Sequence, residues 1–171
     1  MKVAMGFLGA AALAFAGTAQ AAGPTDPEIA HIAYTAGNID IAAAKQALAK
    51  SHNATVRAFA SEMVRDHQAV NDKALALLKE LKVTPQDNAT SDSLSKQADA
   101  TLKRFATLNE HDFDHAYLNN EVAYHGTVNS ALKTTLIPSA TNAQLKSLLE
   151  TGLTLFTEHQ KHAEHLAATL K

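Results

Sequence analysis

The sequence predicts an all-α protein, a ferritin-like antiparallel four-helix bundle with a short crossover helix between its second and third helices. Alanine is frequent, Trp is absent, and only four prolines and seven glycines occur in 171 residues. Such a composition favours helices over sheets. Apolar residues recur at spacings of three and four over long segments. These segments form two pairs separated by one shorter amphipathic stretch, which is the organisation of a bundle with a crossover.

The first 21 residues have the pattern of a secretory signal peptide. Lys2 supplies a positive charge, an apolar run follows, and Ala19-Gln20-Ala21 is a small-x-small cleavage signal. The run is shorter than the roughly 20 residues that span a bilayer. We therefore expect cleavage near Ala21, a periplasmic or secreted location, and one mature domain over residues 22–171. No later segment is apolar enough to predict a transmembrane helix.

Net charge and cysteine content argue against several classes of function. The formal net charge is −2, with acidic and basic residues interspersed, so a nucleic-acid partner is not expected. Cysteine is absent, which excludes disulfides, thiolate metal sites and thiol catalysis. An envelope protein or a second copy of this chain stays open as a partner. The nine histidines are the compositional feature that needs an explanation.

The first pair of helices is predicted over residues 26–50 and 54–81. Asp26 is predicted to cap the first helix, with Pro27 at its first position. Asn53 is predicted to cap the second. Its apolar seam alternates spacings of four and three and reads Val56, Ala60, Met63, His67, Val70, Ala74, Leu77 and Leu81.

The second pair follows a shorter amphipathic segment predicted over residues 92–107. Asn109 is predicted to cap the third long helix, which continues to about Leu136 and is ended by Pro138. The last helix is predicted over residues 142–170. Its seam again alternates four and three and reads Leu145, Leu149, Gly152, Phe156, His159, Ala163, Leu166 and Leu170.

Each long helix interrupts its apolar seam with a polar side chain that can bind a metal. Residues three or four apart share a helix face, so such side chains can act in pairs. Imidazole and carboxylate together suit a divalent transition metal, namely Zn, Cu, Fe or Mn. The candidate metal ligands are Asp40, Asp66, His67, Glu121, His125, His159 and His162.

Two other interpretations of these residues stay open. They could form a buried hydrogen-bond network in a structural or interaction protein of the cell envelope, because buried polar groups need partners. They could also serve a metal-dependent oxidase or peroxidase. Di-iron bundles place Glu three residues before His, but Val64 and Phe156 occupy those positions before His67 and His159. No catalytic residue is therefore assigned, and a non-enzymatic protein is favoured.

Several stretches resemble a bacterial family, the domain-of-unknown-function family 4142. They are residues 59–67, Phe-Ala-Ser-Glu-Met-Val-Arg-Asp-His, then 113–117, His125, and 153–159 with His162-Ala163. The resemblance implies an exported ferritin-like helical bundle without a settled activity. This chain has Asp40 where the family usually has Glu, and Leu153-Thr154 where it usually has Leu-Pro.

Overall fold

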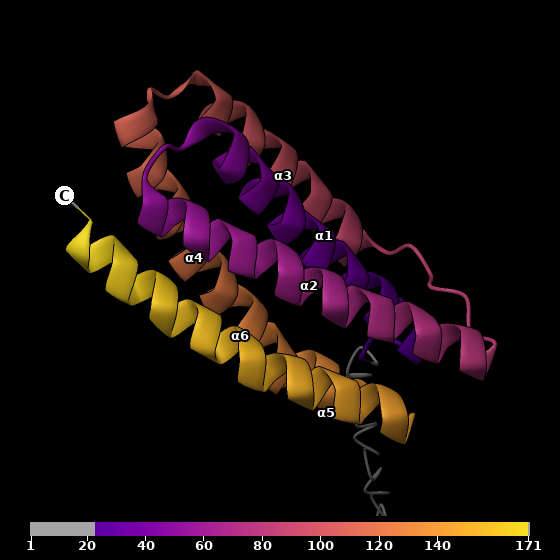
Figure 1. Cartoon of the computed structure of the whole chain (residues 1–171). Helices are drawn as coiled ribbons and strands as arrows, with labels where there is room; N and C mark the ends of the chain where they lie inside the picture. The colour runs from indigo at the N-terminus through magenta and orange to yellow at the C-terminus, as the bar shows by residue number, and fades with distance from the viewer. Residues whose placement is uncertain (1–22, 171) are drawn as a thin grey trace, which may run out of the picture.

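The protein is helical throughout its regular structure, which confirms the predicted all-α class. The structure, a computed structural model, describes residues 23–170, so the predicted signal peptide lies outside the described residues. No strand occurs between residues 23 and 170. The elements are α1 (Asp26–Lys50), α2 (Ala54–Leu81), α3 (Ala89–Thr107), α4 (Glu110–Ala131), the π-helix η1 (Leu132–Leu136), α5 (Ile137–Ser139) and α6 (Ala143–Thr169) (Figure 1).

Four long helices surround a common core, and α3 lies on the outside of α1 (Figure 1). Helix α1 packs against α2 and α4, and α6 packs against the same two helices. Helix α3 lies beside α1 and runs in the same direction: His31 contacts Ser91, and Gln46 Nε2 donates to the Leu102 carbonyl at 3.1 Å. Lys50 Nζ donates to the Ala106 carbonyl at 2.9 Å. Among the described helices, none combines the length and apolar character that crossing a bilayer requires.

Asparagine side chains begin most of the helices. Asn53, Asn88, Asn109 and Asn142 each accept backbone N–H groups that the first helical turn leaves without an intrahelical partner. Asn88 therefore begins α3 at Ala89, three residues earlier than the apolar pattern predicts. The predicted starts of α2 and α4 are confirmed.

Two further predictions about helix ends are wrong. Thr25, not Asp26, occupies the cap position of α1, and its N–H donates to Glu28 Oε2 at 2.8 Å. The helical structure does not end before Pro138. The π-helix η1 leads directly into α5, and α5 includes Pro138. The wider π turn relieves the clash that a proline ring makes with an α-helical carbonyl one turn earlier.

The core is divided into two apolar halves. The tighter half contains large side chains that are fully buried, among them Phe59, Met63, Phe105, Phe113 and Tyr117. The other half is centred on Ile29, Ile32, Leu132, Leu136, Ala140, Leu145 and Leu149. Along each of the four long helices the polar seam residue falls between these two sets. The fold therefore places a polar layer in the middle of the bundle.

Asp26 ties the start of α1 to the start of α6, and its replacement is expected to destabilise the protein. Its carboxylate accepts from the Thr141 N–H and hydroxyl and from the Asn142 N–H at 2.6–2.9 Å. Burial pushes the pKa of Asp26 upward, but these hydrogen bonds outweigh it and lower the pKa below its ordinary value. We expect Asp26→Ala to lose about 1 kcal/mol of unfolding free energy at pH 7, because it removes three hydrogen bonds to a carboxylate that is partly exposed to solvent.

The pH dependence of this stability loss distinguishes the loss of the Asp26 hydrogen bonds from other effects of the substitution. A lowered carboxyl pKa stabilises the fold above about pH 4 and loses that stabilisation as the pH falls further. Chemical denaturation should therefore find the two proteins closer in stability at pH 3 than at pH 7. Asp99→Ala, an exposed position on α3, serves as the control. An equal loss at both pH values would contradict the assigned contact.

Candidate functional site

Five buried polar side chains from the four long helices meet in the middle layer. They are Asp40 of α1, His67 of α2, Glu121 and His125 of α4, and His159 of α6, all at most 3% exposed. Each lies on its helix where the apolar seam is interrupted, so the packing that buries the seams also buries these groups. The sequence identified all five, and the structure brings them together.

Asp40 lies at the centre of this cluster. Its Oδ2 is 3.2 Å from His67 Nε2 and 3.4 Å from His125 Nε2. Neither approach has the angles of a hydrogen bond, and these three atoms have no hydrogen-bond partner among the described residues. Buried polar atoms are normally paired, so three unpaired atoms converging within hydrogen-bond range call for a further partner.

The second nitrogen of His125 is held by the backbone of its own helix. His125 Nδ1 lies 3.0 Å from the Glu121 carbonyl oxygen, one turn earlier. A carbonyl only accepts, so Nδ1 carries the proton and Nε2 presents its lone pair to the cluster. This arrangement is typical of metal-binding histidines, whose outer N–H donates to a carbonyl or carboxylate.

His159 is oriented from the edge of the bundle. Its Nε2 lies 3.1 Å from Asp66 Oδ2, and its Nδ1 is buried without a partner among the described residues. Asp66 also accepts from the Arg65 guanidinium at 2.7 and 3.0 Å. The chain of contacts from Arg65 to Asp66 to His159 fixes the ring across the α2–α6 interface.

His67 is positioned by aromatic packing instead. Its ring stacks on Phe156 with centroids 4.6 Å apart and an interplanar angle of 8°. The ring centroids of His125 and His159 lie 5.6 and 5.4 Å from it. Both ring nitrogens of His67 lack a hydrogen-bond partner among the described residues, although the side chain is buried.

Ligand atoms of these residues are close enough to share an ion. One nitrogen each from His67, His125 and His159 lie within 4.8 Å of one another, and so do ligand atoms of Asp40, Glu121 and His125. Two ligands bound tetrahedrally to zinc at about 2.0–2.1 Å are about 3.3 Å apart. The observed separations of 3.2 and 3.4 Å around Asp40 agree with that spacing.

Burial dominates the electrostatics of the layer. It lowers the pKa of His67 from 6.5 to about 3, assisted by repulsion from His159. It also lowers the pKa of His125. In the opposite sense, burial raises the pKa of Asp40 despite the attraction of His125. Burial and the neighbouring Asp40 raise the pKa of Glu121 well above its ordinary value. Without a cation, burial therefore favours the neutral form of His67, His125, Asp40 and Glu121.

Two of the seven predicted ligands lie outside the buried layer. Asp66 is at its edge, with 18% of its side chain exposed, and contacts His159. His162 is not brought into the cluster, because it lies at the surface and pairs with Glu62 at 3.0 Å. Glu62 was missed by the sequence analysis, although it precedes Asp66 by four residues and so shares its helix face. Ligand atoms of Glu62, Asp66 and His159 also lie within 4.8 Å of one another.

A Ser–His–Asp arrangement elsewhere has a structural explanation. His31 Nδ1 lies 2.9 Å from Ser91 Oγ, and His31 Nε2 lies 2.9 Å from Asp87 Oδ1. The Ser91 hydroxyl is buried and also donates to the Asn88 carbonyl in the cap of α3. A buried hydroxyl engaged in a helix cap is not available as a nucleophile, so this trio fastens α3 to α1.

Fold and site together define a class: an all-helical protein with a buried histidine–carboxylate cluster at mid-height. Comparison with family models then identifies the chain. The model described as domain of unknown function (DUF4142) matches residues 10–166, and the chain belongs to that family, as its motifs indicate. Neither a curated protein nor a solved structure matches it.

The buried carboxyl of Asp40 is expected to reduce the stability of the metal-free protein. A raised carboxyl pKa destabilises the fold above the ordinary value near pH 4, where the unfolded chain ionises more readily. Asp40→Asn should therefore increase the unfolding free energy at pH 7 by on the order of 1 kcal/mol, and this gain should disappear near pH 3.5. Denaturation of protein treated with chelator measures both values.

Asp99→Asn is the control for this measurement, because it makes the same chemical change at an exposed position of α3. It should leave stability within about 0.5 kcal/mol of the starting protein at both pH values. A loss of stability in metal-free Asp40→Asn at pH 7 would mean that the carboxylate is well stabilised without a cation.

Proposed function

We propose that this protein binds one divalent transition-metal ion, with zinc as the best fit, in the polar layer of its bundle. His67, His125, His159 and Asp40 would be the ligands. The observation that carries the proposal is that one nitrogen each of His67, His125 and His159 lie within 4.8 Å of one another. Asp40 Oδ2 lies 3.2 and 3.4 Å from Nε2 of His67 and His125. Three imidazoles and a carboxylate form a donor set suited to zinc.

Charge balance favours a divalent ion. Asp40 and Glu121 are the two carboxyls of the buried layer, and burial disfavours both in their ionised form. A divalent cation among neutral imidazoles would leave no net charge when both carboxyls ionise. Asp66 is already balanced by Arg65, so it need not contribute charge to the ion. Its contact with His159 matches the carboxylate–histidine pairs that orient ligands in zinc sites.

An acidic route leads from solvent to the proposed site. Glu62, with 31% of its side chain exposed, and Asp66 lie on consecutive turns of α2 and face His159. Carboxylates at the surface can take up a hydrated cation and pass it inward as its water is replaced by ligands. This edge therefore supplies the entry path that a buried metal site needs.

The arrangement of the helices supports a ferritin-like four-helix bundle. Helices α1 and α2 form one antiparallel pair, α4 and α6 form the other, and α3 makes the long connection between them. A single long crossover between two helix pairs is the topology of ferritin-like folds. An experimental structure that superimposes α1, α2, α4 and α6 on such a bundle tests this assignment.

Metal analysis of the purified chain tests the proposed function. After exposure to Zn, Cu, Mn and Fe in turn and removal of free ions, elemental analysis should find about one zinc per chain. His67→Ala and His125→Ala should each weaken zinc binding at least 100-fold, because each removes a ligand. Asp66→Asn should weaken it by about 10–100-fold, because it removes only the orientation of His159.

His165→Ala is the matched control, since His165 is an exposed histidine on α6 outside the cluster. It should retain zinc at the original affinity. If the starting protein retains none of the four metals, or if His165→Ala loses zinc as His67→Ala does, the proposal is wrong. In the first case the layer would be a buried polar network in a structural protein.

We further propose that the chain is exported and acts in the periplasm. Support comes from Lys2, the apolar run that follows it, and the small residues Ala19 and Ala21. Intact mass of the chain recovered from a periplasmic extract should correspond to residues 22–171. Recovery of the full-length mass from the cytoplasm alone would contradict export.

A further inference from the structure

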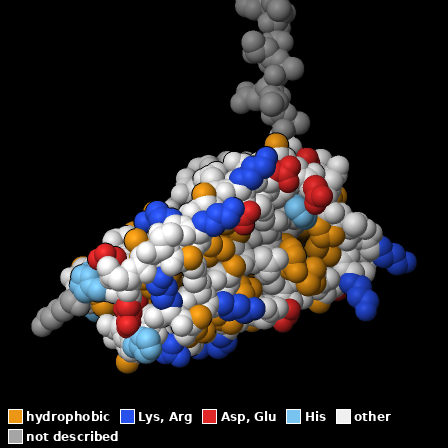
Figure 2. Space-filling view, turned by 90° about the horizontal axis from the view of Figure 1, so that it is seen from above, with side chains coloured by type: hydrophobic (Ala, Val, Ile, Leu, Met, Phe, Trp, Pro, Cys, Tyr) orange, Lys and Arg blue, Asp and Glu red, His pale blue; other side chains and the backbone are white. Residues whose placement is uncertain are grey.

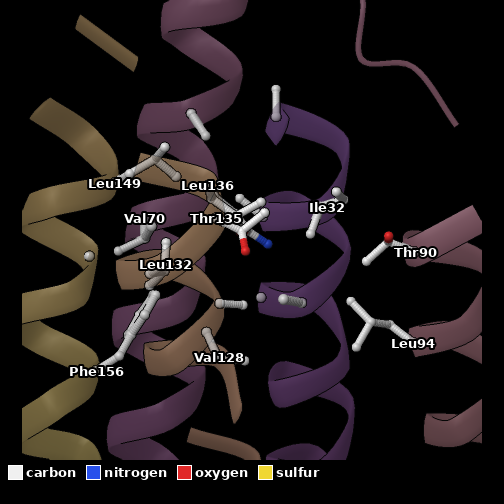
Figure 3. A pocket seen from close by; sticks show the side chains of 18 of the residues that line it. Ile32, Val70, Thr90, Leu94, Val128, Leu132, Thr135, Leu136, Leu149 and Phe156 are labelled. Atoms are coloured by element: carbon white, nitrogen blue, oxygen red, sulfur yellow. The ribbon is translucent and has the colours of Figure 1, made fainter. Parts of the chain in front are cut away.

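A chamber of about 590 Å³ occupies the half of the bundle that holds Ile29 and Leu149. Figure 3 shows Thr90 and Leu94 of α3 on one side of α1, and Leu149 and Phe156 of α6 on the other. Its lining reaches the exposed residues Ala89, Thr90 and Thr135, so the chamber communicates with solvent. The space is within the size range of binding sites for small molecules.

The two halves of the core differ in their packing. In the other half the same four helices bury Phe59, Met63 and Tyr117 at no more than 1% exposure. Here the seam residues Val70, Ala74 and Val128 are only half-buried because they face the chamber. Small residues leave room for the chamber, namely Ala33, Ala36, Ala74 and Ala131. Protein interiors normally close such space, so its retention points to an occupant.

The inner end of the chamber is polar, whereas its walls are apolar. Asp40, His67 and His125 line that end. His67 is 3% exposed, and neither of its ring nitrogens has a hydrogen-bond partner among the described residues. The walls come from Ile, Leu, Val, Phe and Ala side chains of all five longer helices (Figure 3). The chamber thus combines largely apolar walls with a hydrogen-bonding inner end.

The charge of the lining selects a neutral occupant. No Lys or Arg occurs among the described residues that line the chamber, and Glu28 and Asp40 are its carboxyl groups. An anionic headgroup would meet no cation there and would approach the Asp40 carboxyl. The face in Figure 2 mixes basic and acidic side chains with hydrophobic ones, so no positive patch attracts an anion on that face. A hydroxyl or carbonyl group can pair with an imidazole without a charge.

We propose that the chamber binds a neutral small molecule with an apolar body and one hydroxyl or carbonyl end, which meets His67 at the inner end of the chamber. Walls of Leu132, Leu149 and Phe156 would surround the apolar body. The occupant is a small molecule, since the chamber is enclosed by helices on several sides and its volume suits a single compound of drug size. This inference does not depend on the presence of a metal.

Fluorescence titration with N-phenyl-1-naphthylamine, a neutral apolar probe, tests the proposal on the mature chain treated with chelator. The probe should gain fluorescence on saturable binding at one site. Three competitors that share an octyl chain then test which polar group the inner end of the chamber prefers. 4-Octylphenol should displace the probe at least fivefold better than octylbenzene, and 4-octylbenzoate should be the weakest. Equal displacement by phenol and hydrocarbon, or strongest displacement by the anion, would overturn the proposal.

Chamber-filling variants locate the site. Val128→Trp and Ala33→Phe each place a larger side chain in the chamber, from α4 and α1, and should weaken probe binding at least tenfold. Leu75→Trp is the control, because Leu75 is 42% exposed and lies outside the lining. Circular dichroism establishes that each variant is folded, and two filling variants guard against the failure of one.

If the folded filling variants bind the probe as well as Leu75→Trp does, the probe lies elsewhere and the proposal is wrong. Repeating the titration with zinc present separates this proposal from the metal site. Probe binding without zinc retention would support the chamber and contradict the metal proposal. Zinc retention without saturable probe binding would do the reverse.

Discussion

The burial of Asp40 against His67 and His125 is the constraint on which the rest of this structure depends. A carboxyl group and two imidazoles lie 3.2–3.4 Å apart in the middle of an apolar core, without hydrogen-bond geometry between them. Isolated polar groups in such a place destabilise a fold by several kcal/mol. This cost must therefore be offset by the apolar packing on either side of the layer, or by a cation bound within the layer.

The two apolar halves of the core contribute unequally to holding the polar layer in place. The half around Phe59, Phe113 and Tyr117 is closed, with aromatic rings packed edge to face and stacked. It fixes the relative heights of the helices and so the level of the polar layer. The other half keeps a chamber. Rigidity on one side of the layer and open space on the other is a combination expected of a binding protein, because binding sites sacrifice some packing for access.

Much of the fold could be predicted from the sequence, because helix starts and seams are local signals. The bounds of α2 follow from the Asn53 cap and a regular seam. The start of α3 was misplaced because Ala89, Thr90 and Ser91 lie in a polar, turn-like stretch, and the cap at Asn88 was not predicted. The passage of the helix through Pro138 depends on a π turn, which no spacing of residues indicates.

The sequence predicted which residues are buried in the candidate site better than it predicted how they are arranged in space. A polar residue on an apolar seam must lie inside a bundle, which placed Asp40, His67 and His159 correctly. Their shared level depends on how one helix pair is staggered against the other, and that stagger arises from packing between residues distant in sequence. His162 shows the limit of the argument from spacing. It lies three residues after His159, yet the twist of α6 turns it to the surface beside Glu62.

The two proposals give the polar layer two chemically different approaches. From the α2–α6 edge, Glu62 and Asp66 lead to His159, and this acidic path suits a hydrated cation. From the apolar half that holds Ile29 and Leu149, the chamber leads to His67, and no Lys or Arg occurs among the described residues that line it. In the two proposals, the histidine layer separates a route for ions from a route for apolar molecules. Since His67 contacts both His159 and the chamber, an ion and an apolar molecule bound at once would meet at this residue. Contact between the two ligands at His67 would give a physical reason why one half of the core keeps a chamber while the other half is closed.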